Sequence, residues 1–357
     1  MNTKLGFVVL ESGECFPGQW HGGPSKAGEL VFNTSHSGYE EMATDPSYYS
    51  QILITTASQQ GNYGEKDEDK ESEQIWIHGF VCLELQNSKR DHAWREKLLQ
   101  SQVPIVTEVD TRSLTLELRE KGTTWGALVE AQNKSEAIEL AKSLIAEEKR
   151  KDLDWAHRVS TKEVVSLQGE NPQGPKVCVI DFGCKKNIIR ELRSRCSEVI
   201  LVPSRFEEQQ VRDLDPQGIL LSNGPGNPED VQVAAESLRG LLGWRPVFGI
   251  CMGHQILGRA LGAKTFKLKY GHRGANHPIK DDLLSQIYMT SQNHGYAVEE
   301  QSLPKNVKVT HRNLNDGTVA GIEAQDQKAF SVQFHPESHP GPHDSVALFD
   351  YFVKQIQ

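Results

Sequence analysis

The chain has 357 residues, 37% of them hydrophobic, and a formal net charge of −9. Because single hydrophobic cores rarely exceed roughly 250–300 residues, this length predicts two domains, and the acidic balance gives no electrostatic case for nucleic-acid binding. No apolar run reaches the roughly 18 residues of a membrane span, the N-terminus lacks a signal-peptide pattern, and the six cysteines form no CxxC pair. We therefore expect a cytoplasmic protein with reduced thiols and with neither a membrane span nor a zinc site.

The first half of the chain mixes short β-like runs with turn residues. The runs LGFVVL, ELVFNTS, QILITTAS and IHGFVCLEL are rich in β-branched and aromatic residues and are bounded by Gly, Asn, Ser or charges. The charged stretch 65–73 is typical of a solvated loop, and the segment 134–151 has helical spacing of its apolar residues. These patterns predict a mixed α/β, β-rich domain over residues 1–155, followed by a linker at 156–175 that ends in a Gly/Pro/Asn-rich stretch.

From residue 176 to 357, short apolar runs alternate with amphipathic helical patterns. The runs KVCVIDFG, SEVILVP, GILLSNGPGNP and PVFGIC each precede a polar or helical segment. This alternation predicts an α/β domain, an open, mostly parallel sheet with helices on both faces. Ligands of such sheets bind outside the carboxyl ends of the strands. Neither DFG (181–183) nor the glycine-rich SNGPGNP has the companion residues of a nucleotide site.

Cys251 stands between two glycines, where a predicted strand becomes a helix. Gly249 to Gly253 read G-I-C-M-G, the pattern of a nucleophile elbow with cysteine in place of serine. The glycines allow strand and helix to approach closely, the helix N-terminus favours the thiolate, and the N–H of Met252 could donate to an oxyanion. The alternative is a buried structural cysteine, which fits the pattern alone equally well.

A thiolate nucleophile needs a base, and an apolar run near the C-terminus ends in His335-Pro336-Glu337. Residues two apart project to one side of an extended backbone, so Glu337 could orient His335 and complete a Cys–His–Glu triad. An ordinary loop histidine is the alternative for His335 alone. A metal site at His335, His339 and His343 is disfavoured, because the intervening prolines prevent one helical face and no cysteine or carboxylate set completes it.

The stretch GICMGHQ (249–255), together with the downstream HPE (335–337), resembles the class I (triad) glutamine amidotransferase domain. Further segments resemble the small, glutamine-hydrolysing subunits of carbamoyl-phosphate synthase over nearly the whole chain, including an N-terminal half that other class I amidotransferases lack. These segments are FNTSHSGYEEMATDPSY, VDTRSLTLELREKG, DFGCKKNIIREL, LSNGPGNP, YGHRGANHPIK, SQNHGYAV and HPESHPGPHD.

The resemblance implies a glutaminase reaction. Cys251 would attack the side-chain amide of L-glutamine, giving a γ-glutamyl thioester and ammonia, while His335, held by Glu337, would protonate the ammonia and then activate water. The oxyanion would lie between the N–H of Met252 and the 224–226 loop. The implied glutamine-binding residues are Ser47, Gly224, Gly226, Met252, Gln255, Asn293, Gly295 and Tyr296.

The sequence departs from the pattern of the family in three places. Met252 stands where leucine is common, Tyr296 where phenylalanine is frequent, and Gln333-Phe334 where a glycine often precedes HPE. The first exchange conserves volume and leaves the backbone N–H in place. The effect of Gln333-Phe334 on the shape of the pocket stays open.

The resemblance also implies a partner. Such a chain pairs with a large, ATP-using subunit as a heterodimer, or a higher oligomer of heterodimers, and ammonia passes to it through a tunnel. The large subunit uses ATP, Mg and bicarbonate to make carbamoyl phosphate for arginine and pyrimidine synthesis, so no cofactor is expected in this chain. The alternatives are an amidotransferase feeding an anthranilate-type or GMP-type synthase, a free-standing cysteine hydrolase and a non-catalytic glutamine-binding regulatory subunit. Residues 1–150 disfavour the first two, and the presence of Cys251, His335 and Glu337 disfavours the third.

Overall fold

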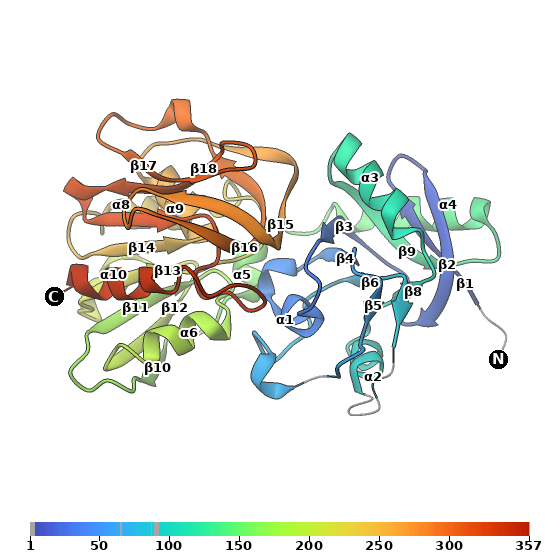
Figure 1. The fold of residues 1–357 in the computed structure, drawn as a ribbon, viewed down its shortest axis with the longest axis horizontal. Helices are drawn as coiled ribbons and strands as arrows, with labels where there is room; N and C mark the ends of the chain where they lie inside the picture. Colours follow the sequence, from blue (N-terminus) through green and yellow to red (C-terminus); the bar gives the residue numbers. More distant parts are fainter. Residues whose placement is uncertain (1–3, 65, 87, 89–92, 357) are drawn as a thin grey trace. The chain divides into compact units, whose positions relative to one another are not determined.

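The structure, a computed structural model, describes residues 4–64, 66–86, 88 and 93–356. The chain divides into two compact units, Met1–Asp152 and Leu153–Gln357, each with its own sheet (Figure 1). Among the described residues, none of the helices combines the length and the apolar character that crossing a bilayer requires.

The first unit is built on a closed β-barrel in the order β1-β2-β8-β6-β4-β3-β9. Closure pairs the edge strands, which would otherwise expose unpaired N–H and C=O groups. The barrel strands are β1 (Lys4–Leu10), β2 (Cys15–Gly22), β3 (Lys26–Asn33), β4 (Gln51–Thr55), β6 (Gly79–Val81), β8 (Ile105–Thr107) and β9 (Thr124–Glu130). The other elements are β5 (Gln59–Gln60), β7 (Glu84–Leu85), α1 (Tyr39–Thr44), η1 (Pro46–Tyr48), η2 (Asp67–Asp69), α2 (Ala93–Gln100) and α3 (Thr111–Lys121).

The helix predicted at 134–151 is confirmed as α4, Lys134–Glu148. It buries Ala137, Ala141 and Ile145 in a cluster with residues of β1 and β9. The charged stretch predicted as a loop at 65–73 contains the single turn η2, and its residue 65 lies outside the described residues.

The second unit contains a ten-stranded sheet in the order β10-β12-β11-β13-β14-β19-β18-β17-β15-β16. The five strands from β12 to β19 pair in parallel, and antiparallel strands flank them on both sides. The strands are β10 (Val165–Gln168), β11 (Lys176–Asp181), β12 (Glu198–Pro203), β13 (Gly218–Leu221), β14 (Val247–Ile250), β15 (Thr265–Asp281), β16 (Gln286–Val298), β17 (Lys308–Asn313), β18 (Val319–Ala324) and β19 (Ala329–Val332).

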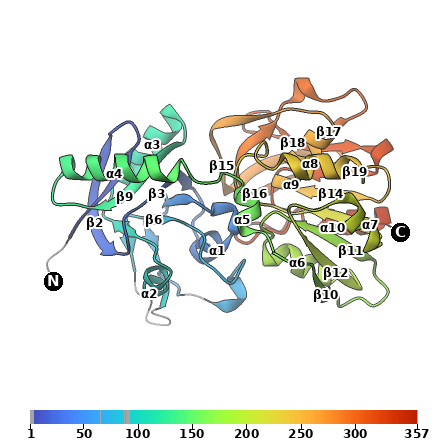
Figure 2. The same ribbon diagram turned by 180° about the vertical axis from the view of Figure 1, so that it is seen from behind.

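Helices cover both faces of this sheet, as the alternating pattern predicts (Figure 2). One core cluster contains residues of α7, α8 and α9, and another, on the opposite face, contains residues of α6 and α10. The helices and turns of the unit are α5 (Trp155–Val159), α6 (Lys186–Arg193), α7 (Glu208–Asp213), α8 (Gln232–Arg239), α9 (Met252–Ala260), η3 (Glu300–Ser302), η4 (Gln325–Gln327) and α10 (Ala347–Ile356). The α/β fold class is therefore confirmed.

The linker predicted at 156–175 is wrong as a description of this segment. It contains most of α5, whose Ala156 lies in the core of the second unit, and β10, which pairs antiparallel with β12. β10 is a partly exposed edge strand and therefore lacks the apolar run that marks the inner strands. The glycines that suggested a linker are packed, since a Cβ on Gly169 would lie 1.8 Å from the carbonyl oxygen of Cys196.

Candidate active site

Cys251 occupies a strained turn between β14 and α9. Its backbone φ is 54° and its ψ is −102°, a left-handed conformation that costs a non-glycine residue about 1–3 kcal/mol. The two neighbouring glycines make the turn possible. A Cβ on Gly253 would lie 2.2 Å from the carbonyl oxygen of Leu221, and one on Gly249 would lie 2.6 Å from the carbonyl oxygen of Gly253. The turn therefore has the strand-to-helix geometry that the sequence predicts.

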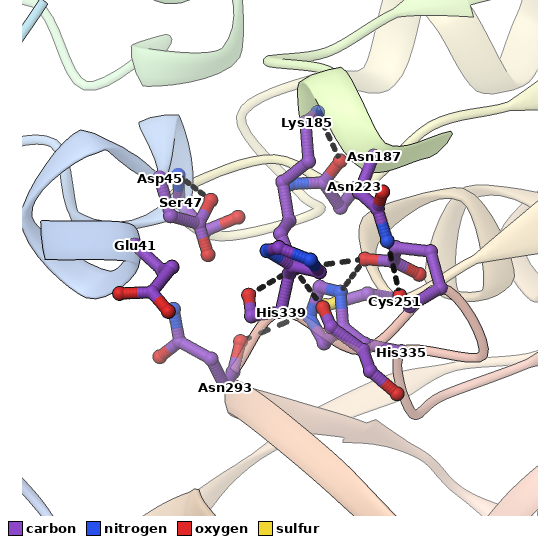
Figure 3. Close-up of polar contacts among 12 residues, drawn as sticks. Glu41, Asp45, Ser47, Lys185, Asn187, Asn223, Cys251, Asn293, His335 and His339 are labelled. Carbon is purple, nitrogen blue, oxygen red and sulfur yellow. Dashed lines mark hydrogen bonds and ion pairs between the residues drawn. The ribbon is translucent and has the colours of Figure 1, made fainter. Parts of the chain in front are cut away.

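The strand next to β14 brings His335 to the same edge of the sheet. β19 pairs in parallel with β14, Ile250 is opposite Val332, and the backbone N–H of Cys251 donates to the carbonyl of Val332 at 2.9 Å. Three residues beyond β19, the N–H of His335 donates to the carbonyl of Ser291 at 2.9 Å. Cys251 and His335 thus lie beside each other at the carboxyl ends of two neighbouring strands (Figure 3).

Glu337 orients the imidazole of His335. Nδ1 of His335 lies 2.7 Å from Oε1 of Glu337, and both side chains are buried. Because a carboxylate only accepts hydrogen bonds, Nδ1 carries a proton and donates it. Nε2 is then the ring nitrogen left for Cys251, and it is buried with no hydrogen-bond partner among the described residues.

Neighbouring charges set the protonation of His335 and Glu337. Burial opposes a charge on His335, but the charges of Glu337 and Cys251 outweigh it and raise the pKa of His335 to about 10. Burial also opposes ionisation of Glu337, yet Lys185 and His335 together lower the pKa of Glu337 to about 2. At neutral pH, therefore, the resting site holds a protonated His335 and an ionised Glu337.

Sequence reasoning missed the residues that support Glu337. Nζ of the buried Lys185 lies 3.1 Å from Oε1 of Glu337 and also donates to the carbonyl of His339 at 2.8 Å. Asn187 donates through Nδ2 to the backbone carbonyl of Glu337. In the sequence both residues belong to the KKN (185–187) that follows DFGC just beyond β11, and nothing in that run indicates a contact with Glu337.

The DFG stretch has a structural role here. Oδ1 of Asp181 accepts the N–H groups of Gly183 at 2.8 Å and Cys184 at 2.7 Å, and Oδ2 accepts that of Thr161 at 2.7 Å. Asp181 therefore shapes the turn that leads to Lys185. No three His, Cys, Asp or Glu side chains within the described ranges are placed to hold one metal ion.

Several of the predicted glutamine-binding residues lie close to the nucleophile. The carbonyl oxygen of Asn293, on β16, is 3.6 Å from Sγ of Cys251, and Gln255 of α9 donates through Nε2 to the carbonyl of Tyr296 at 2.8 Å. Nδ2 of Asn293 is buried and, among the described residues, has no hydrogen-bond partner. β16 and α9 thus meet at Cys251.

The glycines among the predicted binding residues allow close approaches of the backbone. Gly224 follows β13, and its Cβ would lie 2.3 Å from the carbonyl oxygen of Phe182. Gly226 has a φ of +93°, which favours glycine. Gly295 lies on β16 between Asn293 and Tyr296. All three residues belong to the second unit.

Ser47 belongs to the first unit, where it lies in the short turn η1. It is buried, and its backbone N–H donates to Oδ1 of Asp45 at 2.8 Å. Asp45 therefore caps this turn and fixes the backbone of Ser47 within the unit.

Comparison with known proteins places both halves of the chain in known families. The family model for "Glutamine amidotransferase class-I" matches residues 178–355, and that for "Carbamoyl-phosphate synthase small chain, CPSase domain" matches residues 8–128. The chain is 45% identical to the carbamoyl phosphate synthase small chain of Symbiobacterium thermophilum, over 97% of each chain. It is 41% identical to the corresponding chain of Escherichia coli K12, covering 99% of this chain and 98% of the relative. It is also 41% identical to the chloroplastic chain of Arabidopsis thaliana, covering 98% and 85%.

The two family models match both halves of the chain, and the relatives match it almost from end to end. The chain therefore belongs to the carbamoyl phosphate synthase small chain family and carries a class-I glutamine amidotransferase domain as its second half.

Proposed function

We propose that this chain hydrolyses L-glutamine through a Cys251–His335–Glu337 triad. Sγ of Cys251 attacks the side-chain amide carbon, and the resulting tetrahedral adduct collapses with cleavage of the C–N bond. His335 gives its proton to the departing nitrogen, which leaves as ammonia, and a γ-glutamyl thioester remains on Cys251. Water then attacks the thioester while His335 takes the proton of that water, and glutamate leaves with regeneration of the thiolate.

Backbone N–H groups stabilise the charge that develops on the amide oxygen. The N–H of Met252 is in the first turn of α9, where a helix leaves its N–H groups without intrahelical partners. The other donors are N–H groups of the 224–226 loop. In other enzymes, removal of one such donor costs about 3–4 kcal/mol of transition-state stabilisation.

Free glutamine needs polar partners for its ammonium and its carboxylate, because burying an unpaired charge is costly. The unpartnered Nδ2 of Asn293 is suited to an oxygen of the substrate. The remaining contacts come from Ser47, Gly224, Gly226, Met252, Gln255, Gly295 and Tyr296.

The ammonia is delivered to a large, ATP-using subunit, in keeping with relatives that are named small chains. That subunit, in a heterodimer with this chain, receives ammonia through a tunnel and makes carbamoyl phosphate from bicarbonate, with ATP and Mg, for arginine and pyrimidine synthesis. In this division of labour the chain needs no cofactor of its own.

One observation carries the proposal: Nδ1 of a buried histidine is held 2.7 Å from Glu337 beside a cysteine in a strained turn. The test measures glutamate release from glutamine with and without the large subunit, bicarbonate and ATP. We expect weak activity alone, strong stimulation in the complete mixture, and loss of activity in Cys251→Ser. Cys15→Ser, a partly exposed cysteine of the first unit, is the matched control and should stay active. Thiol-independent activity, or none in either mixture, would overturn the proposal.

A further inference from the structure

Gln333 is a buried side chain that connects the nucleophile turn to a predicted binding residue. It follows β19 and is only 1% exposed. Its Nε2 donates to the backbone carbonyl of Cys251 at 3.4 Å, and its Oε1 accepts from Nε2 of Gln255 at 3.1 Å. One side chain therefore touches both Cys251 and Gln255, although Gln333 itself belongs to neither the triad nor the predicted binding set.

The backbone carbonyls of Tyr296 and Cys251 determine the direction of these hydrogen bonds. The carbonyl of Tyr296 can only accept, so the NH₂ group of Gln255 must face it. The carbonyl of Cys251 likewise requires the NH₂ group of Gln333. Rotating the amide of Gln255 by half a turn would set its oxygen against the oxygens of Tyr296 and Gln333. Rotating that of Gln333 would set its oxygen against the carbonyl of Cys251 and its NH₂ against that of Gln255, so both orientations are determined by the network.

This network decides what Gln255 can recognise. Both N–H bonds of Gln255 are used, one by Tyr296 and one by Gln333. Among the described residues, no group donates a hydrogen bond to Oε1 of Gln255. This oxygen is also not one of the buried side-chain atoms that lack a hydrogen-bond partner. Gln255 can therefore offer the substrate only an acceptor, which suits the α-ammonium of glutamine and not its carboxylate.

We propose that Gln333 is a positioning residue that fixes the amide of Gln255 for the α-ammonium of glutamine and ties this recognition to the backbone of Cys251. The inference rests on the proposed glutaminase function and deepens it. It predicts that Gln333 matters for a substrate with an ammonium group and not for one without it.

The test compares glutamine with 4-carbamoylbutanoate, which has the same amide and carboxylate but lacks the ammonium. Gln333→Leu removes both hydrogen bonds, and we expect it to raise KM for glutamine by roughly 10- to 100-fold, the usual effect of losing a hydrogen bond to a charged group. The KM for 4-carbamoylbutanoate should stay at its wild-type value. Where turnover of this analogue is too slow to measure, its inhibition constant against glutamine provides the same comparison. Gln60→Leu removes a buried glutamine of the first unit and should change neither constant.

A second variant separates positioning from loss of packing. In Gln333→Glu the protonated carboxyl keeps the pattern of the amide, with O–H donating to Cys251 and C=O accepting from Gln255. Ionisation removes the donor and sets a negative oxygen against the carbonyl of Cys251. We therefore expect KM for glutamine near the wild-type value at low pH and a rise with pH beyond that of the wild type, whereas Gln333→Leu should be impaired at every pH.

Equal changes in the constants for glutamine and 4-carbamoylbutanoate, or no change in either, would overturn the inference while leaving the glutaminase function intact. A wild-type complex that releases no glutamate would overturn both.

Discussion

Gly253 is the position at which a small substitution should disturb the strained turn most. A Cβ there would lie 2.2 Å from the carbonyl oxygen and 2.6 Å from the carbonyl carbon of Leu221, at the end of β13. These are backbone atoms, so Gly253→Ala must displace either α9 or β13. Overpacking of this kind costs about 3 kcal/mol, from which the ~1 kcal/mol that alanine gains over glycine in a helix is subtracted. We expect the second unit to lose about 2 kcal/mol of its free energy of unfolding.

Gly258→Ala is the matched control, because it makes the same substitution in the same helix. Its Cβ would meet the end of a side chain, Cγ2 of Val298, at 3.0 Å. The helix gain and the small adjustment of Val298 offset each other, so the change in the free energy of unfolding should stay within about 1 kcal/mol.

Buried cysteines report the unfolding of each unit separately. Cys178 in the second unit and Cys82 in the first are both 0% exposed, so each reacts with an alkylating reagent only when its surroundings open. In a urea series, Gly253→Ala should weaken the protection of Cys178 and leave that of Cys82 unchanged. Glutamate release should fall by roughly 10²-fold, the usual result of a displacement of about 1 Å at a reacting group. If Gly253→Ala matches Gly258→Ala in both measurements, the account of the turn is refuted.

Two further predictions concern Asp45, which caps the turn that contains Ser47, and the charges of His335 and Glu337. Asp45→Ala and Asp110→Ala both remove a side-chain acceptor of a helix N-terminus and should both lower stability in denaturation, Asp45→Ala by about 1 kcal/mol. Only Asp45→Ala should also raise KM for glutamine, because Ser47 is one of the proposed binding residues, and equal KM values would contradict that proposal. The pKa of His335 is raised from 6.5 to about 10, so its charge stabilises the fold fully below pH 6.5 and ever less as the pH rises toward 10. The pKa of Glu337 is lowered from 4.5 to about 2, so its contribution is present above pH 4.5 and is lost toward pH 2. Compared with the wild type, the free energy of unfolding of the second unit should therefore depend less on pH on the alkaline side in His335→Asn and on the acid side in Glu337→Gln. Unchanged slopes would contradict the charge assignment.

The nucleophile turn and the HPE segment could be predicted because the residues that define each of them lie within a few positions of one another in the sequence. Two glycines around Cys251 indicate a close approach of strand and helix, and the two-residue spacing of His335 and Glu337 indicates a common side of the backbone. Alternating apolar runs likewise predicted the parallel sheet, whose inner strands are buried along most of their length.

The parts that could not be predicted depend on contacts between distant segments or on strands without an apolar pattern. Asn187 is 150 residues from Glu337 in the chain, and nothing in KKN indicates that contact. β10 reads as a linker because it is a partly exposed edge strand, and most of β15 is too polar to stand out as a strand. Closure of the N-terminal strands into a barrel is a property of their pairing, which short β-like runs leave undetermined.

The central claim is that Cys251 forms a covalent bond with the glutamyl group of the substrate. The most direct test is rapid acid quenching of the complete complex during turnover of isotopically labelled glutamine, followed by digestion and mass spectrometry. We expect a hydroxylamine-sensitive γ-glutamyl adduct on the peptide that contains Cys251, and no such adduct in Cys251→Ser. Steady release of glutamate with no label on Cys251, or with the label on another residue, would contradict the account.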